Sequence, residues 1–318
     1  MQRIVVVAVG LFFGGSAFAQ QDPHFTMYMF NKQAINPGYV GSIGTTALQA
    51  LGRYQWAGIE GAPQTITFSA QGLAGKARKI ALGLNVFNDR LGVDNHTGAY
   101  LQYAYHAPVN ETTTLSIGLQ AGATQYRAKL SELIQPTWAY PAGDPILAHD
   151  KITAWLPNFG AGAYLWNDAF YIGLSVPHMI NNLYDRERVV PDSIMAKQYR
   201  HYFLFGGIKF RVSDHVAIQP HAMVKYAAGN NVSVPVSTDL SLSFIFKNII
   251  MLGVAHRLND SFDAFLKAQL TRNLSIGYAY DYIISELSNY SSGSHEVMLG
   301  WEFGKALEMF KGPRLWTF

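Results

Sequence analysis

Hydrophobic and polar residues alternate along most of this chain, and the alternation restricts its fold more than any other feature of the sequence. Between Thr114 and Thr124 every second residue is apolar: Leu115, Ile117, Leu119, Ala121 and Ala123. Near the end of the chain the apolar members of the same pattern are Val297, Leu299, Trp301 and Phe303. A period of two residues is that of a β-strand, and segments of roughly ten residues have the length that a tilted strand needs to cross a bilayer. The pattern therefore predicts an all-β fold, a transmembrane antiparallel β-barrel of an outer membrane.

The composition favours a barrel over a soluble β-sandwich, whose strands also alternate. Charged residues make up only 14% of the chain, whereas an ordinary globular domain has about 25%. Much of the surface is therefore expected to face something other than water. The formal net charge of +3 is small for 318 residues and gives no reason to expect nucleic acid as a partner.

Residues 1–19 have the features of a secretory signal peptide. Arg3 supplies a positive start, residues 4–13 are apolar, and Ala17-Phe18-Ala19 is a small-x-small cleavage site. The apolar stretch is too short to span a bilayer as a helix. We expect cleavage near Ala19 and export to the outer membrane. The chain has no Cys, which excludes disulfides and a lipid anchor on cysteine.

Counting the alternating runs predicts about fourteen strands in the segment 45–303, with an uncertainty of one or two strands. An even number is usual in bacterial single-chain barrels. The predicted strands are 45–54, 64–72, 80–88, 97–106, 113–126, 156–166, 169–175, 200–212, 215–226, 236–246, 249–257, 262–270, 273–282 and 294–303.

The connections between these strands sort by their place in the order. Links from even to odd strands are mostly short polar turns, such as Asn167-Asp168, Ser213-Asp214, Lys247-Asn248 and Thr271-Arg272. Links from odd to even strands include the long segments 127–155, 176–199 and 283–293. Outer-membrane barrels have short periplasmic turns and longer extracellular loops, so the long segments are predicted to be extracellular.

Charged residues in the strands fall mainly on the polar, inward face of the predicted barrel. They are Lys209, Arg211, Lys225, Asp239, Asp263, Lys267, Asp281, Glu296 and Glu302. A Lys or Arg facing lipid would cost about 2–4 kcal/mol at mid-depth, so the lumen is the expected place for them. Pro220 does not fit a central strand, because it cannot donate a ladder hydrogen bond. We expect a bulge there, or a local error in the assigned register.

Residues 20–44 precede the first strand and are rich in aromatic and turn residues. A barrel of this size is wider than the eight-stranded barrel that side chains alone can fill. We therefore predict an N-terminal plug inside the lumen; the alternative is a flexible periplasmic lead. The residues expected to form the plug are Phe25, Tyr28, Phe30, Asn36 and Pro37.

Known catalytic and metal-binding motifs are absent from the sequence. Neither an H-E-x-x-H helix nor a G-x-S-x-G elbow occurs, and no glycine-rich loop is suited to phosphate. Ser294-His295-Glu296 cannot act as a triad in a strand, because His295 points to the opposite face from its neighbours. We expect no catalytic residue, metal or cofactor, although a triad assembled from separate strands would leave no such motif. Gly160 and Gly162 are expected where a strand bends or a plug approaches closely.

Several blocks of the chain, in order, resemble the PorP/SprF family of type IX secretion system membrane proteins. The first is QDPHFTMYMFNKQAINPGYVG, from Gln21 to Gly41, in which His24 and Met27 depart from the usual glutamines. The other blocks are RYQWAGIEGAP (Arg53 to Pro63), LPNFGAG (Leu156 to Gly162), YIGLSVPH (Tyr171 to His178), RHYF (Arg200 to Phe203) and IGYAYDYIISELSNYSSGSHE (Ile276 to Glu296).

The resemblance implies a role in secretion or surface display of proteins that carry a C-terminal type IX signal. It implies as partners the C-terminal domain of a cargo protein or gliding adhesin and periplasmic PorK/PorN-like ring components, besides outer-membrane lipid. The family is not known for enzymes. The expected function is therefore non-enzymatic binding and positioning of secreted partner proteins. The rival is a plugged channel for a hydrophobic small molecule, which would have an apolar, ligand-shaped pocket beside the plug.

Candidate partner-binding residues follow from the predicted orientation. Those expected at the extracellular end are Trp56, Ile59, Pro63, Leu287, Tyr290 and His295. The tail 304–318 should emerge in the periplasm, where Arg314 and Trp316 are candidates for docking a periplasmic partner. The alternative for this tail is a disordered end.

Overall fold

The computed structural model describes residues 24–75, 77–129, 152–183, 198–229, 232–233 and 236–303. The expected signal peptide 1–19 and tail 304–318 lie outside the described residues. So do the central parts of the long segments 127–155 and 176–199. Among the described residues no helix has both the length and the apolar character needed to span a membrane.

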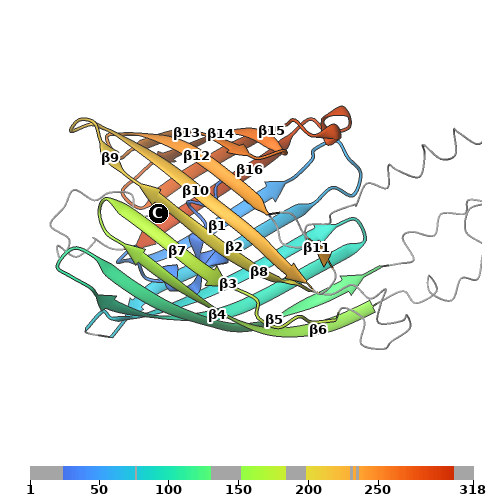
Figure 1. Ribbon diagram of the computed structural model, residues 1–318, viewed down its shortest axis with the longest axis horizontal. Helices are drawn as coiled ribbons and strands as arrows, with labels where there is room; N and C mark the ends of the chain where they lie inside the picture. Colours follow the sequence, from blue (N-terminus) through green and yellow to red (C-terminus); the bar gives the residue numbers. More distant parts are fainter. Residues whose placement is uncertain are drawn as a thin grey trace, which may run out of the picture.

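Fourteen antiparallel strands form a closed barrel (Figure 1), which confirms the predicted fold. The ring closes because β16 pairs with β1, and β8 pairs with β10. Its strands are β1 (Thr46–Tyr54), β2 (Gln64–Ala74), β3 (Ile80–Leu91), β4 (Asp94–Pro108), β5 (Thr114–Ala128), β6 (Ile152–Trp166), β7 (Phe170–Val176), β8 (Arg200–Ile208), β10 (Val216–Gly229), β12 (Ser237–Phe246), β13 (Ile250–Arg257), β14 (Ser261–Gln269), β15 (Leu274–Ile283) and β16 (Ser294–Phe303). Two short strands, β9 (Phe210–Arg211) and β11 (Val232–Ser233), also pair with β10.

The side chains of the strands alternate between an apolar outer face and a polar or packed inner face. On β16, Leu299 is 49% exposed and Trp301 is 41% exposed, whereas Met298, which faces the lumen, is only 1% exposed. The same alternation holds on β4, where Leu101 is 69% exposed and Gln102 only 3%. An apolar band of this extent is unstable in water and matches the hydrocarbon layer of a membrane.

Six of the nine charged residues predicted to face the lumen are buried there: Lys225, Asp239, Asp263, Lys267, Asp281 and Glu296. Lys209 and Glu302 are half-buried, and Arg211 is exposed near the end of its strand.

Pro220 does not cause a bulge, so that expectation is wrong. The register of β10 runs regularly past it, with His221 opposite Gly207 and Ile218 opposite Phe210. Instead the neighbouring strand is interrupted between β8 and β9, beside the proline. The missing N–H of Pro220 accounts for the interruption, because it removes one ladder hydrogen bond without adding a residue.

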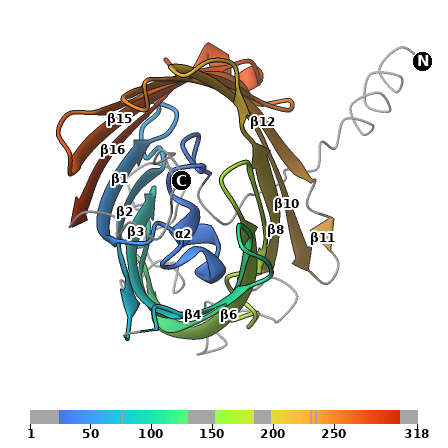
Figure 2. The ribbon, with the colours of Figure 1, turned by 90° about the vertical axis from the view of Figure 1, so that its left-hand side faces the viewer.

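Residues 24–44 lie inside the ring of strands, as the view along the barrel shows (Figure 2). We refer to them as the N-terminal segment. It contains a short helix, α2 (Lys32–Ile35), and a 3-10 turn, η1 (Pro37–Tyr39). The main hydrophobic core of the molecule forms between this segment and the inner wall, where Phe30 meets Phe265 edge to face with ring centroids 6.0 Å apart.

Candidate functional site

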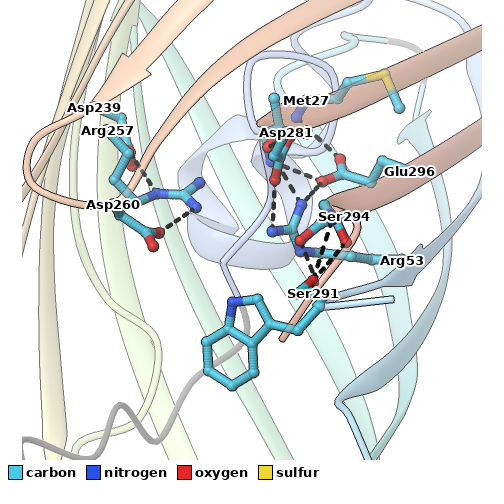
Figure 3. Close-up of polar contacts among 12 residues, drawn as sticks. Met27, Arg53, Asp239, Arg257, Asp260, Asp281, Ser291, Ser294 and Glu296 are labelled. Atoms are coloured by element: carbon cyan, nitrogen blue, oxygen red, sulfur yellow. Dashed lines mark hydrogen bonds and ion pairs between the residues drawn. The ribbon is translucent and has the colours of Figure 1, made fainter. Parts of the chain in front are cut away.

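A buried network of charges holds the beginning of the N-terminal segment against the barrel wall (Figure 3). Arg53 on β1 lies 2.7 Å from Asp281 on β15 and 2.7 Å from Glu296 on β16. The Glu296 carboxylate also accepts hydrogen bonds from the backbone N–H groups of Thr26, at 2.7 Å, and Met27, at 3.0 Å. The Thr26 hydroxyl donates to Asp281 at 2.6 Å. Three strands and the N-terminal segment therefore share one set of buried ionic hydrogen bonds.

The closure of the barrel brings these groups together. Arg53 and Glu296 stand directly opposite each other in the pairing of β1 with β16, although 243 residues separate them in the chain. Removing one partner of a buried ion pair typically costs 3–5 kcal/mol, because the remaining charge stays buried without compensation. The network therefore couples the position of the N-terminal segment to the closing seam of the barrel.

A second ion-pair group lies on β12 and β13, which only β14 separates from β15 of the first group (Figure 3). Arg257 at the end of β13 contacts Asp239 at 2.7 Å and Asp260 at 3.1 Å. His24 is buried between the two groups. Burial and the nearby cations, chiefly Lys225, lower the pKa of His24 well below its usual range, which favours the neutral form of this side chain.

The middle of the N-terminal segment is held by amide side chains. Gln33 donates hydrogen bonds to the carbonyl oxygens of Ala70, at 2.9 Å, and Leu84, at 3.1 Å. Gln102 on β4 returns a hydrogen bond to the carbonyl of Gln33 at 3.0 Å. These contacts join α2 to β2, β3 and β4, so they fix the depth at which α2 sits.

The Asn36-Pro37-Gly38 turn packs against glycines of β5 and β6. A Cβ atom at Gly118 would lie 2.3 Å from the backbone nitrogen of Gly38, and one at Gly162 would lie 2.0 Å from the Asn36 side-chain oxygen. The Asn36 amide donates to the carbonyl of Ala163 at 3.0 Å. The expected close approach at Gly162 is confirmed, whereas Gly160 is close to Pro177 of the β7–β8 connection.

Lys32 is fully buried in a cage of tyrosine rings. Its ammonium nitrogen lies 3.7 Å from the centroid of Tyr171, with Tyr39 and Tyr164 at 5.4 and 5.9 Å. Burial lowers the pKa of Lys32 well below its usual range, while the ring faces offset part of the cost of the charged form. Sequence reasoning missed both Lys32 and Arg53. The signal that could have identified Lys32 is its place inside the aromatic segment predicted to fill the lumen, between the polar residues Asn31 and Gln33.

Two hairpin loops at the opposite end of the barrel from the short turns are joined to each other. We call residues 55–63 and 284–293 the loop crest. The backbone N–H of Ala57 donates to Gly293 at 2.7 Å, and that of Ser292 donates to Ala57 at 2.8 Å. The loop crest is therefore a rigid pair of loops rather than two independent hairpins.

The structure brings most of the predicted extracellular residues into or beside the loop crest. Trp56, Ile59, Pro63 and Leu287 are half-buried in it, and Tyr290 is 75% exposed. His295 points to the outer face of β16, where its ring accepts or donates a hydrogen bond at 2.8 Å with the Tyr278 hydroxyl. Its neighbours Ser294 and Glu296 are buried on the inner side, which separates the three residues as predicted. Arg314 and Trp316 lie outside the described residues.

A small cavity of about 80 Å³ lies between the N-terminal segment and the wall, toward the end that carries the loop crest. Its lining combines rings, among them Phe87 and Tyr100, with hydroxyls and amides such as Thr67, Asn85 and Gln120. Pockets for small molecules typically measure about 300–1,000 Å³. The cavity is smaller than that, although much of its lining is apolar, so its size alone does not favour the rival function as a channel for a hydrophobic ligand.

Within the described part of the chain, no group of three or more His, Asp or Glu side chains is arranged to hold a metal ion. The buried carboxylates of Asp281 and Glu296 are both paired with Arg53.

A closed barrel with an apolar outer band and a polar, occupied lumen defines an outer-membrane β-barrel protein. Comparison with protein families gives the assignment within this class. The family described as type IX secretion system membrane protein PorP/SprF matches residues 17–301, and the chain belongs to this family. No curated protein matches the chain.

Solved structures with a similar fold are outer-membrane barrels of low sequence identity. The CymD monoaromatic hydrocarbon channel has 11% identity and a TM-score of 0.47, with 82% of this chain and 89% of that one covered. A FadL homologue of Pseudomonas aeruginosa has 13% identity and a TM-score of 0.46, with 91% and 96% covered. The P. putida toluene transporter TodX has 8% identity and a TM-score of 0.45, with 85% and 93% covered. Likeness at this level carries no argument about function.

Proposed function

We propose that this barrel is a non-enzymatic component of the type IX secretion machinery that binds secreted partner proteins and supports their surface attachment. The partners proposed are the C-terminal domains of type IX cargo proteins such as adhesins, and PorK/PorN-like ring components on the periplasmic side. Membership of the PorP/SprF family supports this role.

The observation that carries the proposal is the position of the N-terminal segment. It lies in the lumen, and it is attached to β1, β15 and β16 through Arg53, Asp281 and Glu296. We propose that it acts as a plug. A folded cargo protein could not pass through a lumen occupied in this way, so the barrel would act through its two ends.

The loop crest is the proposed contact surface at the extracellular end. Its two loops are tied by backbone hydrogen bonds, and Tyr290 projects from it with 75% of its surface exposed. Exposed aromatic side chains on a rigid support lose little conformational entropy on binding, which is why they are enriched at interface hot spots. We propose that partner proteins contact this crest together with the neighbouring long loops.

Loop replacement tests the proposal. Segments 130–150 and 184–196 would each be replaced by a short Gly-Ser turn, and Tyr290→Ala would be made separately. We expect the two loop variants to insert, because shortening a loop changes closure entropy only slightly. Tyr290→Ala should also insert, because the side chain is 75% exposed. In all three variants we expect cargo display at the cell surface to fall. Surface display is measured by protease accessibility on whole cells, and insertion by heat-modifiable gel mobility.

A matched control replaces the short turn Thr271-Arg272, at the other end of the barrel and between β14 and β15, by Gly-Ser. This variant should display cargo normally. Normal display in every extracellular variant, with normal insertion, would show that the extracellular loops are not the contact surface.

A further inference from the structure

Basic side chains gather around a second cavity, at the barrel end that carries the short turns. The cavity measures about 250 Å³. We call the four basic residues that line it, Lys209, Arg211, His215 and Lys247, the basic mouth. Apolar side chains, Val216, Ala217 and Ile245, form the rest of the lining with the polar turn residues.

Two adjacent turns bring the basic mouth together. Lys209 and Arg211 continue the inward-facing positions of β8 into β9, and Lys247 lies in the turn that follows β12. The backbone N–H of Lys247 donates to the carbonyl of His215 at 2.7 Å, which ties the turn after β12 to the turn before β10. Lys247 has a φ of 50°, in the left-handed region that glycine adopts most easily. Asn248 has a φ of 53°, and the N–H of Ile249 donates to the carbonyl of Phe246 at 2.9 Å, so the two residues form the tight hairpin turn between β12 and β13.

The charges of the basic mouth lack ionic partners. At the other end of the lumen, Arg53 and Arg257 each have a carboxylate at 2.7 Å. Within the described residues, by contrast, neither Lys209, Arg211 nor Lys247 forms an ion pair. The ammonium of Lys209 is shielded from solvent and has no hydrogen-bond partner there.

Two acidic residues lie in the neighbourhood and do not neutralise the basic mouth. Asp214 is part of the cavity lining, and Asp168 is close enough to interact electrostatically with Lys209. Neither makes an ion pair among the residues that the structure describes. Like charges gathered in a partly enclosed site attract and concentrate anions, so the uncompensated cations indicate an anionic ligand.

We propose that the basic mouth binds an acidic peptide segment of a periplasmic protein. The side chains of Lys209, Arg211 and Lys247 line one cavity at a short-turn end, together with Ala217 and Ile245 of the inner wall. A periplasmic protein could therefore reach them at that end. Carboxylate side chains entering from the periplasm would pair with the guanidinium and ammonium groups. The apolar part of the lining would contact the aliphatic portions of the peptide. The proposal rests on the periplasmic part of the proposed function, but its test is peptide binding to the purified barrel and involves neither the loop crest nor cargo display.

Peptide binding to the purified full-length barrel tests the proposal. The probe is a fluorescein-labelled peptide of alternating Glu and Gly, compared with the same peptide carrying Gln. We expect the Glu peptide to bind in a salt-dependent way and the Gln peptide to bind at least about tenfold more weakly, because the site recognises charge. Equal binding of the two peptides, or no binding of the Glu peptide, would overturn the proposal.

Two variants with the same loss of charge locate the site. Arg211→Gln with Lys247→Gln removes two exposed cations of the basic mouth and should weaken binding of the Glu peptide about tenfold. Lys79→Gln with Arg272→Gln removes one Lys and one Arg from other short turns, both also exposed, and should leave binding unchanged. Equal weakening in both variants would show non-specific attraction to a basic barrel end.

Two further measurements do not depend on a variant that folds. Zero-length carbodiimide cross-linking of the Glu peptide to the unmodified barrel should join it to Lys209 or Lys247, as mass spectrometry would show. Cross-links confined to other lysines would overturn the proposal. Inorganic phosphate and anionic phospholipid vesicles should compete poorly; displacement of the peptide by either at concentrations matched in charge would assign the site to phosphate groups instead.

Discussion

At the residue scale, two glycines of the wall set how closely the N-terminal segment approaches. Gly118→Ala would place a Cβ atom 2.3 Å from the backbone nitrogen of Gly38, and no flexible side-chain end is available there to move aside. We expect a destabilisation of about 1–3 kcal/mol, as for other overpacked sites. Tryptic cleavage at Lys32, which is fully buried in the native barrel, should accelerate when the segment is displaced.

The matched control for this substitution is Gly52→Ala. A Cβ at Gly52 would meet nothing within 4 Å, so this variant changes the same residue type in a strand without touching the segment. Similar rates of cleavage at Lys32 in both variants would contradict the packing described for the Asn36-Pro37-Gly38 turn.

Residue-scale contacts were the least accessible to sequence reasoning. Asp281 and Glu296 were predicted to face inward because their strands alternate, and both are buried in the lumen. Their partner Arg53 was not predicted. It contacts Glu296 only because β1 pairs with β16. The two residues are 243 positions apart in the sequence, and no local pattern specifies which residues stand opposite each other in such a pairing.

At the scale of single elements, β16 tests which face of a strand contacts lipid. Leu299 is 49% exposed on the outer face, so Leu299→Arg should oppose insertion by about 2–4 kcal/mol if the residue lies near mid-depth. Glu302→Arg, on the same strand and facing inward, should insert nearly normally. Heat-modifiable gel mobility measures the folded fraction, and equal assembly of the two variants would contradict the register of β16.

Met298 is a poorer control than Glu302, although it also faces inward. It is 1% exposed and belongs to the core formed with the N-terminal segment, so an arginine there would disturb packing even without any contact with lipid.

At the scale of single elements, sequence reasoning predicts the positions of the strands well. Strand positions follow from a period of two and from turn residues, whereas the break between β8 and β9 depends on Pro220 of the neighbouring strand.

At the scale of the whole molecule, the distribution of buried charge separates the two ends of the barrel. Near the loop crest, Arg53 and Arg257 are each paired with carboxylates, and the Arg53 network holds the N-terminal segment. The cations of the basic mouth have no ionic partner among the described residues. Each end is thus suited to a different contact, and the occupied lumen separates them. The number of strands was predictable from the sequence, because it follows from alternation and from the turn residues between the strands.

Conductance in a planar lipid bilayer tests most directly whether the N-terminal segment closes the lumen. The purified barrel is expected to show little conductance, because the segment is held by buried ion pairs and hydrogen bonds on several strands. Deletion of residues 22–42 should open a stable channel, provided that heat-modifiable mobility shows the shortened barrel to be folded. A large, stable conductance of the intact protein, equal to that of the deletion variant, would contradict a barrel that works through its ends.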